Sequence, residues 1–183
     1  MITNGQHFVQ EGFVSRAKFL PDDVYAQVLD SIVTACADAV LMNSKGEMLI
    51  GKRAVEPHPD WWIIGGRMRP GESFEHAAAR NIKRELGVDI EPSRFKYLCT
   101  YSLVWARRAQ PPHENGSHTV SITMLVRVTD EEVGLIKHNE EYETLKWVYP
   151  TEFIFDDTFH PALGMVAKNV TAYIAMPQRD EAR

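Results

Sequence analysis

Apolar residues recur along the chain in short runs that are separated by polar turns. The runs predict six strands, at residues 33–42, 48–53, 61–64, 97–105, 119–128 and 145–149. A turn signal at 43–46 joins the first two runs, so we expect them to pair as a β-hairpin. The polar segments at 107–116 and 130–143 predict two loops, and the second of these is acidic.

One segment has the periodicity of an amphipathic helix. Its apolar residues follow i, i+4 spacing: Phe74, Ala78, Ile82 and Leu86. Ser73 is a suitable N-cap for this helix and Gly87 a suitable C-cap. Two further helices are predicted at 21–33 and 161–175. Because strands and helices interleave, the pattern indicates a mixed α/β layer architecture.

Length and composition are those of one globular domain. The chain has 183 residues, of which 44% are hydrophobic and 25% charged. We expect an N-terminal extension at 1–18, a folded domain at 19–160, and a C-terminal helix and tail at 161–183. Cys36 and Cys99 lie in apolar runs and are predicted core residues rather than a disulfide framework.

Charge and hydropathy exclude some classes of partner. The net charge of −5 has the wrong sign for a general nucleic-acid binder. The longest apolar stretch, Ile32–Met42, is much shorter than the roughly 20 residues that a membrane span requires. The N-terminus lacks an apolar signal core. We therefore expect a cytoplasmic protein with no membrane partner and no nucleic-acid partner.

The chemistry of the chain concentrates around the predicted central helix. Gly65 and Gly66 allow a sharp backbone turn and leave carbonyl groups free to face a ligand. Glu72 precedes Arg80 by about two helical turns, so the two can form an ion pair that braces the loop against the helix. Glu85 lies at the edge of the buried stripe. A sheltered carboxylate in that position suits a hard divalent cation.

The segment from Gly66 to Val88 resembles the Nudix box, whose usual form is G-x5-E-x7-R-E-U-x-E-E-x-G-U with U aliphatic. All fixed positions match except two glutamates, which Asn81 and Arg84 replace. The resemblance implies a Nudix-type α/β/α sandwich with a mixed β-sheet. With two box carboxylates missing, and with Arg84 placing a cation where a second metal would sit, it implies a single Mg²⁺, with Mn²⁺ as the alternative ion.

One Nudix subgroup, the GDP-mannose mannosyl hydrolases, has the same two replacements. The resemblance to this subgroup runs from about Phe19 to Phe153. It implies that the Gly65 carbonyl, Glu85 and Glu141 hold the metal. It also implies a reaction in which water attacks the sugar C1 and the nucleoside diphosphate leaves, and a homodimer that pairs through its N-terminal region.

Further roles follow from the same resemblance. Arg53 and Arg67 would contact the diphosphate, and Asp38 would lie near the sugar. Arg80 would orient the box together with Glu72, so both join Arg67 as candidate catalytic residues.

The sequence offers more than one candidate for the general base. Tyr142 occupies the position of the subgroup's general-base histidine, and we include it among the candidate catalytic residues. A tyrosine with a pKa near 10 is a poor base at neutral pH. His138, Glu140 and Glu143 of the acidic loop are the alternatives, and the sequence does not choose among them.

The leading hypothesis is a Mg²⁺-dependent hydrolase of a nucleoside diphosphate sugar. A GDP-mannose-like molecule is the first candidate substrate. A second hypothesis is a Nudix pyrophosphohydrolase that acts on another nucleoside diphosphate derivative by attack at phosphorus. A third is a catalytically silent nucleotide-binding domain, which the missing carboxylates and Tyr142 motivate.

Overall fold

The computed structural model describes residues 6–176, and the elements named below belong to that part of the chain. The strands are β1 (Thr34–Met42), β2 (Met48–Arg53), β3 (Trp61–Trp62), β4 (Ile64–Arg67), β5 (Lys96–Trp105), β6 (Ser117–Arg127) and β7 (Tyr142–Val148). The α-helices are α1 (Asp22–Ser31), α2 (Phe74–Leu86), α3 (Asp130–Leu135) and α4 (Pro161–Ala175). Short 3₁₀ turns occupy Pro92–Arg94, His113–Asn115 and Pro150–Glu152.

The strands form one mixed sheet in the order β3-β2-β1-β6-β5, with β4 also paired to β1 and β7 to β2. The central strand β1 runs parallel to β6 and antiparallel to β4. The predicted hairpin is correct at its turn and wrong along its length, because β1 and β2 pair only at Met42 and Met48. Each strand has two edges, and those of β1 are occupied by β4 and β6, so β2 pairs with β7 and β3 instead.

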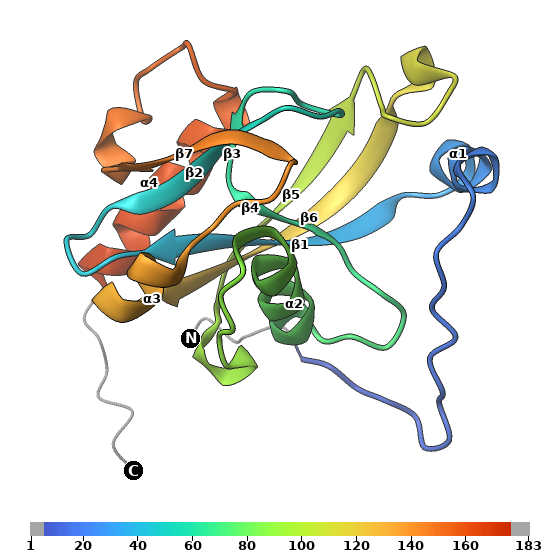
Figure 1. The fold of residues 1–183 in the computed structure, drawn as a ribbon, viewed down its shortest axis with the longest axis horizontal. Coiled ribbons are helices and arrows are strands. Elements are labelled where there is room, and N and C mark those ends of the chain that lie inside the picture. The colour runs from blue at the N-terminus through green and yellow to red at the C-terminus, as the bar shows by residue number, and fades with distance from the viewer. Residues whose placement is uncertain (1–5, 177–183) are drawn as a thin grey trace.

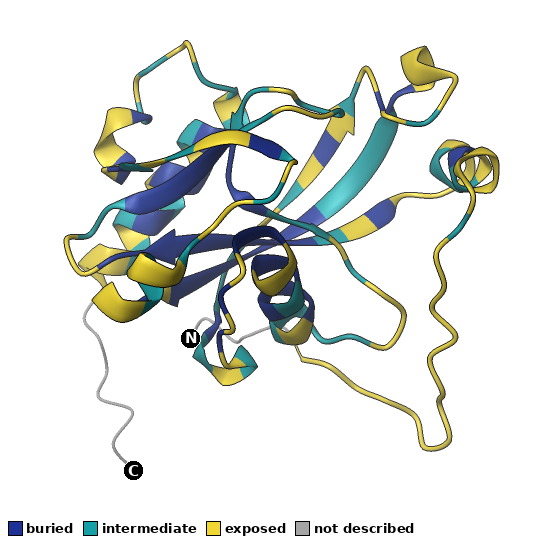
Figure 2. Ribbon diagram, in the orientation of Figure 1, coloured by how far each residue is buried: buried dark blue, intermediate teal, exposed yellow. Residues whose placement is uncertain are grey.

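Helices cover both faces of the sheet (Figure 1). On one face of the sheet, α2 packs against every second residue of β1. The residues of β1 between them face α4 on the other side. Both faces of β1 are therefore buried over residues 37–42, whereas most of β5 is intermediate or exposed (Figure 2). The burial of β1 on both faces explains its nearly continuous apolar run. The expected α/β sandwich with a mixed β-sheet is confirmed.

The predicted caps of the central helix are confirmed. The Ser73 side chain accepts a hydrogen bond from the His76 amide, and Gly87 adopts a left-handed conformation with φ of 73°. Three consecutive alanines, residues 77–79, are buried against the sheet, and their small side chains let α2 approach it closely.

The acidic segment at 130–143 differs from the loop that the sequence predicts. Residues 130–135 form α3, which begins at a capping box between Thr129 and Glu132. The last strand begins at Tyr142, three residues earlier than expected, because β7 pairs with β2 as far as Arg53. The helix predicted at 161–175 is present as α4.

The N-terminal part of the chain lies apart from the sheet. Residues 6–18 are exposed and follow an extended path to α1 (Figures 1 and 2). Part of the predicted extension, residues 1–5, and part of the predicted tail, residues 177–183, lie outside the described residues. Among residues 6–176, none of the helices combines the length and apolar character that crossing a membrane requires.

Candidate functional site

The sharp turn predicted at Gly65 and Gly66 is wrong, because both glycines lie in the extended strand β4, directly beside Asp38. Gly65 of β4 pairs with Asp38 of β1, and a Cβ atom on Gly65 would lie 2.4 Å from the Asp38 Oδ1 atom. Only glycine fits at this point. Asp38 is 7% exposed, and the Ser121 hydroxyl donates a hydrogen bond to it. Burial raises the pKa of the Asp38 carboxyl to about 6, against the opposing effects of Ser121 and the Arg53 charge.

Asn81, one of the two box replacements, connects the helix to the sheet. Its side-chain amide donates to the Ala37 carbonyl at 3.1 Å and to the Gly66 carbonyl at 2.9 Å. A glutamate cannot donate in this way unless it is protonated, so Asn81 gives α2 a neutral attachment to both β1 and β4.

The predicted ion pair between Arg80 and Glu72 is present. Arg80 Nε donates to one carboxylate oxygen at 2.5 Å and Nη2 donates to the other at 2.8 Å. Arg80 also donates to the Arg67 carbonyl at 2.9 Å, and Glu72 accepts from the Arg69 amide at 2.7 Å. These contacts hold the 67–72 loop against α2. Burial tends to raise the pKa of Glu72, but the hydrogen bonds and the positive charges of Arg80 and Arg69 outweigh it and lower that pKa.

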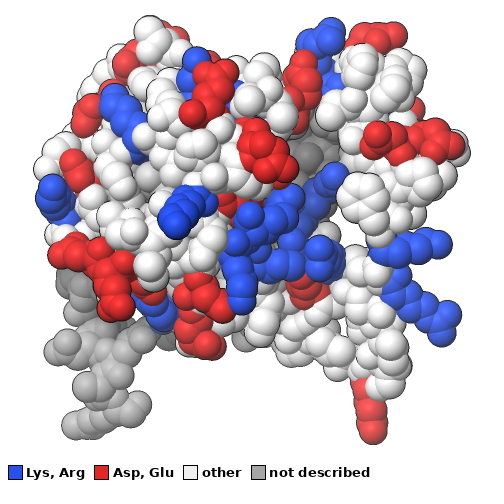
Figure 3. All heavy atoms as spheres, in the orientation of Figure 1, with Lys and Arg blue, Asp and Glu red and all other residues white. Residues whose placement is uncertain are grey.

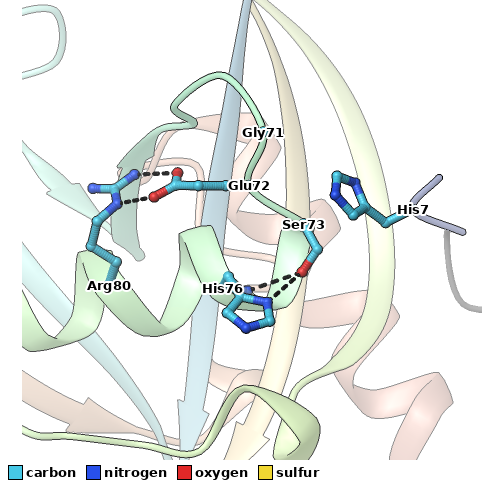
Figure 4. A pocket seen from close by; sticks show the side chains of 6 residues that line it. All are labelled: His7, Gly71, Glu72, Ser73, His76 and Arg80. Atoms are coloured by element: carbon cyan, nitrogen blue, oxygen red, sulfur yellow. Dashed lines mark hydrogen bonds and ion pairs between the residues drawn. The ribbon is translucent and has the colours of Figure 1, made fainter. Parts of the chain in front are cut away.

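The same two side chains line a cavity of about 440 Å³ at the start of α2. Figure 4 shows Arg80 and Glu72 facing each other on one side of this cavity, with Ser73 and His76 at the N-terminal end of the helix. His7, from the extended N-terminal segment, lies opposite.

Glu85 is fully buried and its two carboxylate oxygens have different partners. The Tyr142 hydroxyl donates to Oε2 at 2.5 Å, and the Arg84 guanidinium contacts Oε1 closely. Arg84 also lies 3.2 Å from the Glu141 carboxylate. Burial raises the pKa of Glu85 to about 7, although Tyr142 and Arg84 both favour its charged form.

Backbone contacts explain why the acidic segment lies next to Glu85. The Asn139 amide donates to the Glu85 carbonyl at 3.0 Å, and the Lys137 amide donates to the Leu86 carbonyl at 2.9 Å. On the other side, the Ala54 amide donates to the Glu141 carbonyl at 2.9 Å. The end of α2 and the end of β2 therefore position the same short segment.

The two candidate diphosphate-binding arginines have different surroundings. Arg53 is half-buried, and among the described residues its Nε atom has no hydrogen-bond partner. Its charge lowers the pKa values of Asp38 and Tyr142, so it faces the site. Arg67 is exposed, and its guanidinium carbon lies 3.7 Å from the ring centroid of Tyr25 in α1. Figure 3 shows basic side chains gathered near the middle of this face, where β4 and α2 meet.

Tyr142 is even less suited to be a base than the sequence suggests. Burial and the adjacent Glu85 carboxylate raise the pKa of its hydroxyl. Of the alternatives in the acidic segment, Glu143 pairs with Lys52 at 2.7 Å. His138 and Glu140 are exposed.

The metal site can be assessed from its donor groups. No three His, Cys, Asp or Glu side chains in residues 6–176 gather as a ready metal cluster. Two carboxylates, Glu85 and Glu141, nevertheless converge on one cation, the Arg84 guanidinium. The guanidinium acts as a stand-in for a cation beside the glycines of β4, since a Cβ atom on Gly66 would lie 3.1 Å from its Nη2 atom. Two carboxylates suit a hard divalent ion if Arg84 moves away.

Some features of the site carried no sequence signal. Four aromatic rings, those of His58, Trp62, Trp105 and His160, form a cluster with centroids 5.1 to 5.6 Å apart. Trp62 also helps to lower the pKa of Asp38, which connects the cluster to the site. The contact between Tyr142 and Glu85 joins residues 57 positions apart, and no local pattern predicts such a pair.

Comparison with known proteins identifies the family. The NUDIX domain matches residues 34–169. An RNA pyrophosphohydrolase of Cereibacter sphaeroides (strain KD131 / KCTC 12085) is 27% identical over 130 residues, which cover 65% of this chain and 77% of the relative. These findings support Nudix hydrolase activity, and they do not establish the GDP-mannose mannosyl hydrolase subgroup.

Solved structures agree on the fold. The MutT protein from Methanosarcina mazei Go1 has a TM-score of 0.62 at 16% identity, covering 79% of this chain and 96% of that protein. The NUDIX domain of Shewanella oneidensis NrtR, complexed with ADP ribose, has a TM-score of 0.58 at 15% identity, covering 85% and 99%. The family match spans most of the chain and includes the box, α2 and the acidic segment. This chain belongs to the NUDIX domain family.

Proposed function

We propose that this chain is a divalent-metal-dependent hydrolase of a nucleoside diphosphate sugar, with a GDP-mannose-like substrate as the first candidate. The observation that carries the proposal is the convergence of Glu85 and Glu141 on Arg84, beside Gly66 of β4. Glu85 is the one carboxylate left in the second half of the box. A site with so few carboxylates suits a single Mg²⁺ or Mn²⁺ ion.

In this proposal Glu85, Glu141 and the Gly65 carbonyl hold the metal. The bound metal would neutralise charge on the diphosphate as it departs. Arg53 and Arg67 bind the remaining phosphate oxygens and stabilise the same developing charge. Arg67 has to leave the ring of Tyr25 to do so, a movement that an exposed side chain can make without changing the backbone.

The other residues position these groups. The ion pair of Arg80 with Glu72 holds the 67–72 loop, and Tyr142 holds the Glu85 carboxylate through its hydroxyl rather than acting as the base. Asp38 supplies a buried carboxyl next to Gly65, where it can hydrogen-bond to a sugar hydroxyl. The proton of the attacking water goes to an exposed group of the acidic segment, for which His138 and Glu140 are the candidates.

Attack at phosphorus is the second candidate, and the comparisons favour considering it. A relative is named RNA pyrophosphohydrolase, and a structural neighbour binds ADP ribose. A substrate with a diphosphate linkage would use the same metal and the same arginines. A nucleotide-binding domain without turnover is the third candidate, because Arg84 pairs with both carboxylates.

A substrate screen separates these candidates. The protein is incubated with Mg²⁺ and a panel of GDP-, UDP- and ADP-sugars, ADP-ribose and 5′-phosphorylated RNA, in ¹⁸O-labelled water. Label in the released sugar supports attack at carbon, whereas label in a phosphate product supports attack at phosphorus. Ligand binding without product under all conditions would support the silent domain. Glu85→Gln should abolish any turnover of the wild-type protein.

We also propose a homodimer, which the subgroup resemblance suggests. Apolar side chains on the extended N-terminal segment support it, since Phe8 is 84% exposed, Phe13 53% and Phe19 97%. Light scattering after gel filtration, over a wide range of concentration, tests this proposal. A monomer at every concentration would contradict it.

A further inference from the structure

Arg84 occupies an unusual place for a basic residue. It stands at a box position that is normally glutamate, and its guanidinium lies between the two carboxylates assigned to the metal. Its side chain is 46% exposed, whereas that of Glu85 is 0% exposed. The preceding residue, Lys83, points elsewhere and pairs with Asp89 at 2.6 Å. Arg84 is thus the basic side chain of α2 that meets both carboxylates.

The sequence places the Arg84 charge where a second metal would sit, and the structure places it on the ligands of the first. Glu85 and Glu141 can share the guanidinium now, and they can share a metal, but they cannot hold both cations in one small space. Like charges in contact repel strongly in a partly dry site. Without any cation, the buried Glu85 carboxylate would be uncompensated, which is strongly unfavourable.

We infer that Arg84 is a tethered cation that competes with the divalent metal for Glu85 and Glu141, and that metal entry displaces its guanidinium onto the bound diphosphate. This inference rests on the metal site of the proposed function. The exposed half of the side chain gives the guanidinium a route out of the site without a change in the helix backbone.

The displacement couples metal binding to nucleotide binding. A guanidinium that has left two carboxylates needs another anion, and a diphosphate offers paired oxygens that match its geometry. Nucleoside diphosphate therefore removes part of the competition and tightens metal binding. By linkage, the metal tightens nucleotide binding by the same factor.

The test compares Arg84→Gln with Lys83→Gln, which makes the same charge change one residue away on the same helix. Mn²⁺ binding to the metal-free full chain is measured by the electron paramagnetic resonance signal of the free ion, with and without GDP. We expect Arg84→Gln to bind Mn²⁺ at least about tenfold more tightly than wild type without GDP. Lys83→Gln should remain close to wild type. GDP should tighten Mn²⁺ binding to wild type and have a smaller effect on Arg84→Gln.

The outcomes separate this inference from the function on which it rests. Equal or weaker Mn²⁺ binding by Arg84→Gln, with clear binding by wild type, overturns the competition and leaves the metal site intact. Absence of Mn²⁺ binding in every variant, with and without GDP, overturns both. Should Arg84→Gln fold only when metal is present, thermal melts with and without Mn²⁺ provide the comparison. A larger Mn²⁺-induced rise in melting temperature than for wild type supports the competition, and an equal or smaller rise refutes it.

Discussion

Replacing Glu85 by glutamine separates the stability of this fold from its proposed activity. Glu85 is fully buried, and most of its surroundings are apolar residues of the core that α2 forms with the sheet. Glutamine has nearly the same shape and can still accept the hydrogen bond from the Tyr142 hydroxyl. The substitution therefore removes the charge and keeps most of the packing.

The size of the effect follows from the perturbed carboxyl. Its pKa of about 7, compared with 4.5 for a free glutamate, makes the charged form about 3 kcal/mol less favourable in the fold than in water. Because the folded pKa is raised, the contribution of Glu85 to stability is fully present below pH 4.5 and is lost as the pH rises through 7. The glutamine amide meets the Arg84 guanidinium unfavourably, which offsets part of this effect. We therefore expect Glu85→Gln to raise the free energy of unfolding by about 1 to 3 kcal/mol at pH 8.

Urea unfolding with a metal chelator, followed between pH 5 and pH 8, measures this effect. The difference between Glu85→Gln and wild type should be greatest at pH 8 and should shrink toward pH 5. Glu91→Gln, at an exposed position with no side-chain capping bond, is the matched control and should change little at either pH. A variant that is less stable than wild type at pH 8 would refute the reasoning. Glu85→Gln should also lose metal-dependent turnover. Such a trade is expected when a buried charge that lowers stability is needed for activity.

Three further predictions concern other parts of the molecule. Arg108 is 2% exposed and donates to Asp30 of α1 at 2.7 Å. Arg108→Ala should therefore lower the free energy of unfolding, measured by urea titration, by about 2 kcal/mol or more. A loss near zero would contradict a structural role for Arg108. Glu72→Gln should weaken the contacts of the 67–72 loop, which faster amide hydrogen exchange at Arg69 would reveal; unchanged exchange would argue against the bracing role. Burial lowers the pKa of His58, so its imidazole stays neutral in the aromatic cluster until the pH falls below 6.5. Its protonation should quench tryptophan fluorescence in that range and reduce stability as the pH falls, and both effects should be smaller in His58→Gln.

Local features of the site could be predicted from residue spacing. The periodicity and caps of α2 depend on neighbours within one or two helical turns, and the ion pair of Glu72 with Arg80 depends on a loop only a few residues long. Such interactions join residues that are separated by a fixed number of positions, so they can be read from the sequence. By contrast, the sharp turn predicted at position 65 was wrong, because glycine is required there by the close approach of Asp38 on the neighbouring strand β1.

Strand partners and side-chain neighbours from distant segments could not be predicted in this way. The hairpin of β1 and β2 pairs only next to its turn, because β4 and β6 occupy the edges of β1, and an apolar run alone does not specify its partner. No local pattern in the polar loop at 107–116 places Arg108 against Asp30 of α1 or pairs Arg107 with Glu56.

The sequence by itself determined the family box, the central helix and the missing carboxylates. Only the tertiary structure decided that Arg84 lies between Glu85 and Glu141, and that Tyr142 holds Glu85. The physical reason is the packing of the acidic segment against the end of α2, where backbone hydrogen bonds to Glu85 and Leu86 set its position. Contacts of this kind join segments that are distant in the chain, and they form only when the sheet and helices have assembled around them.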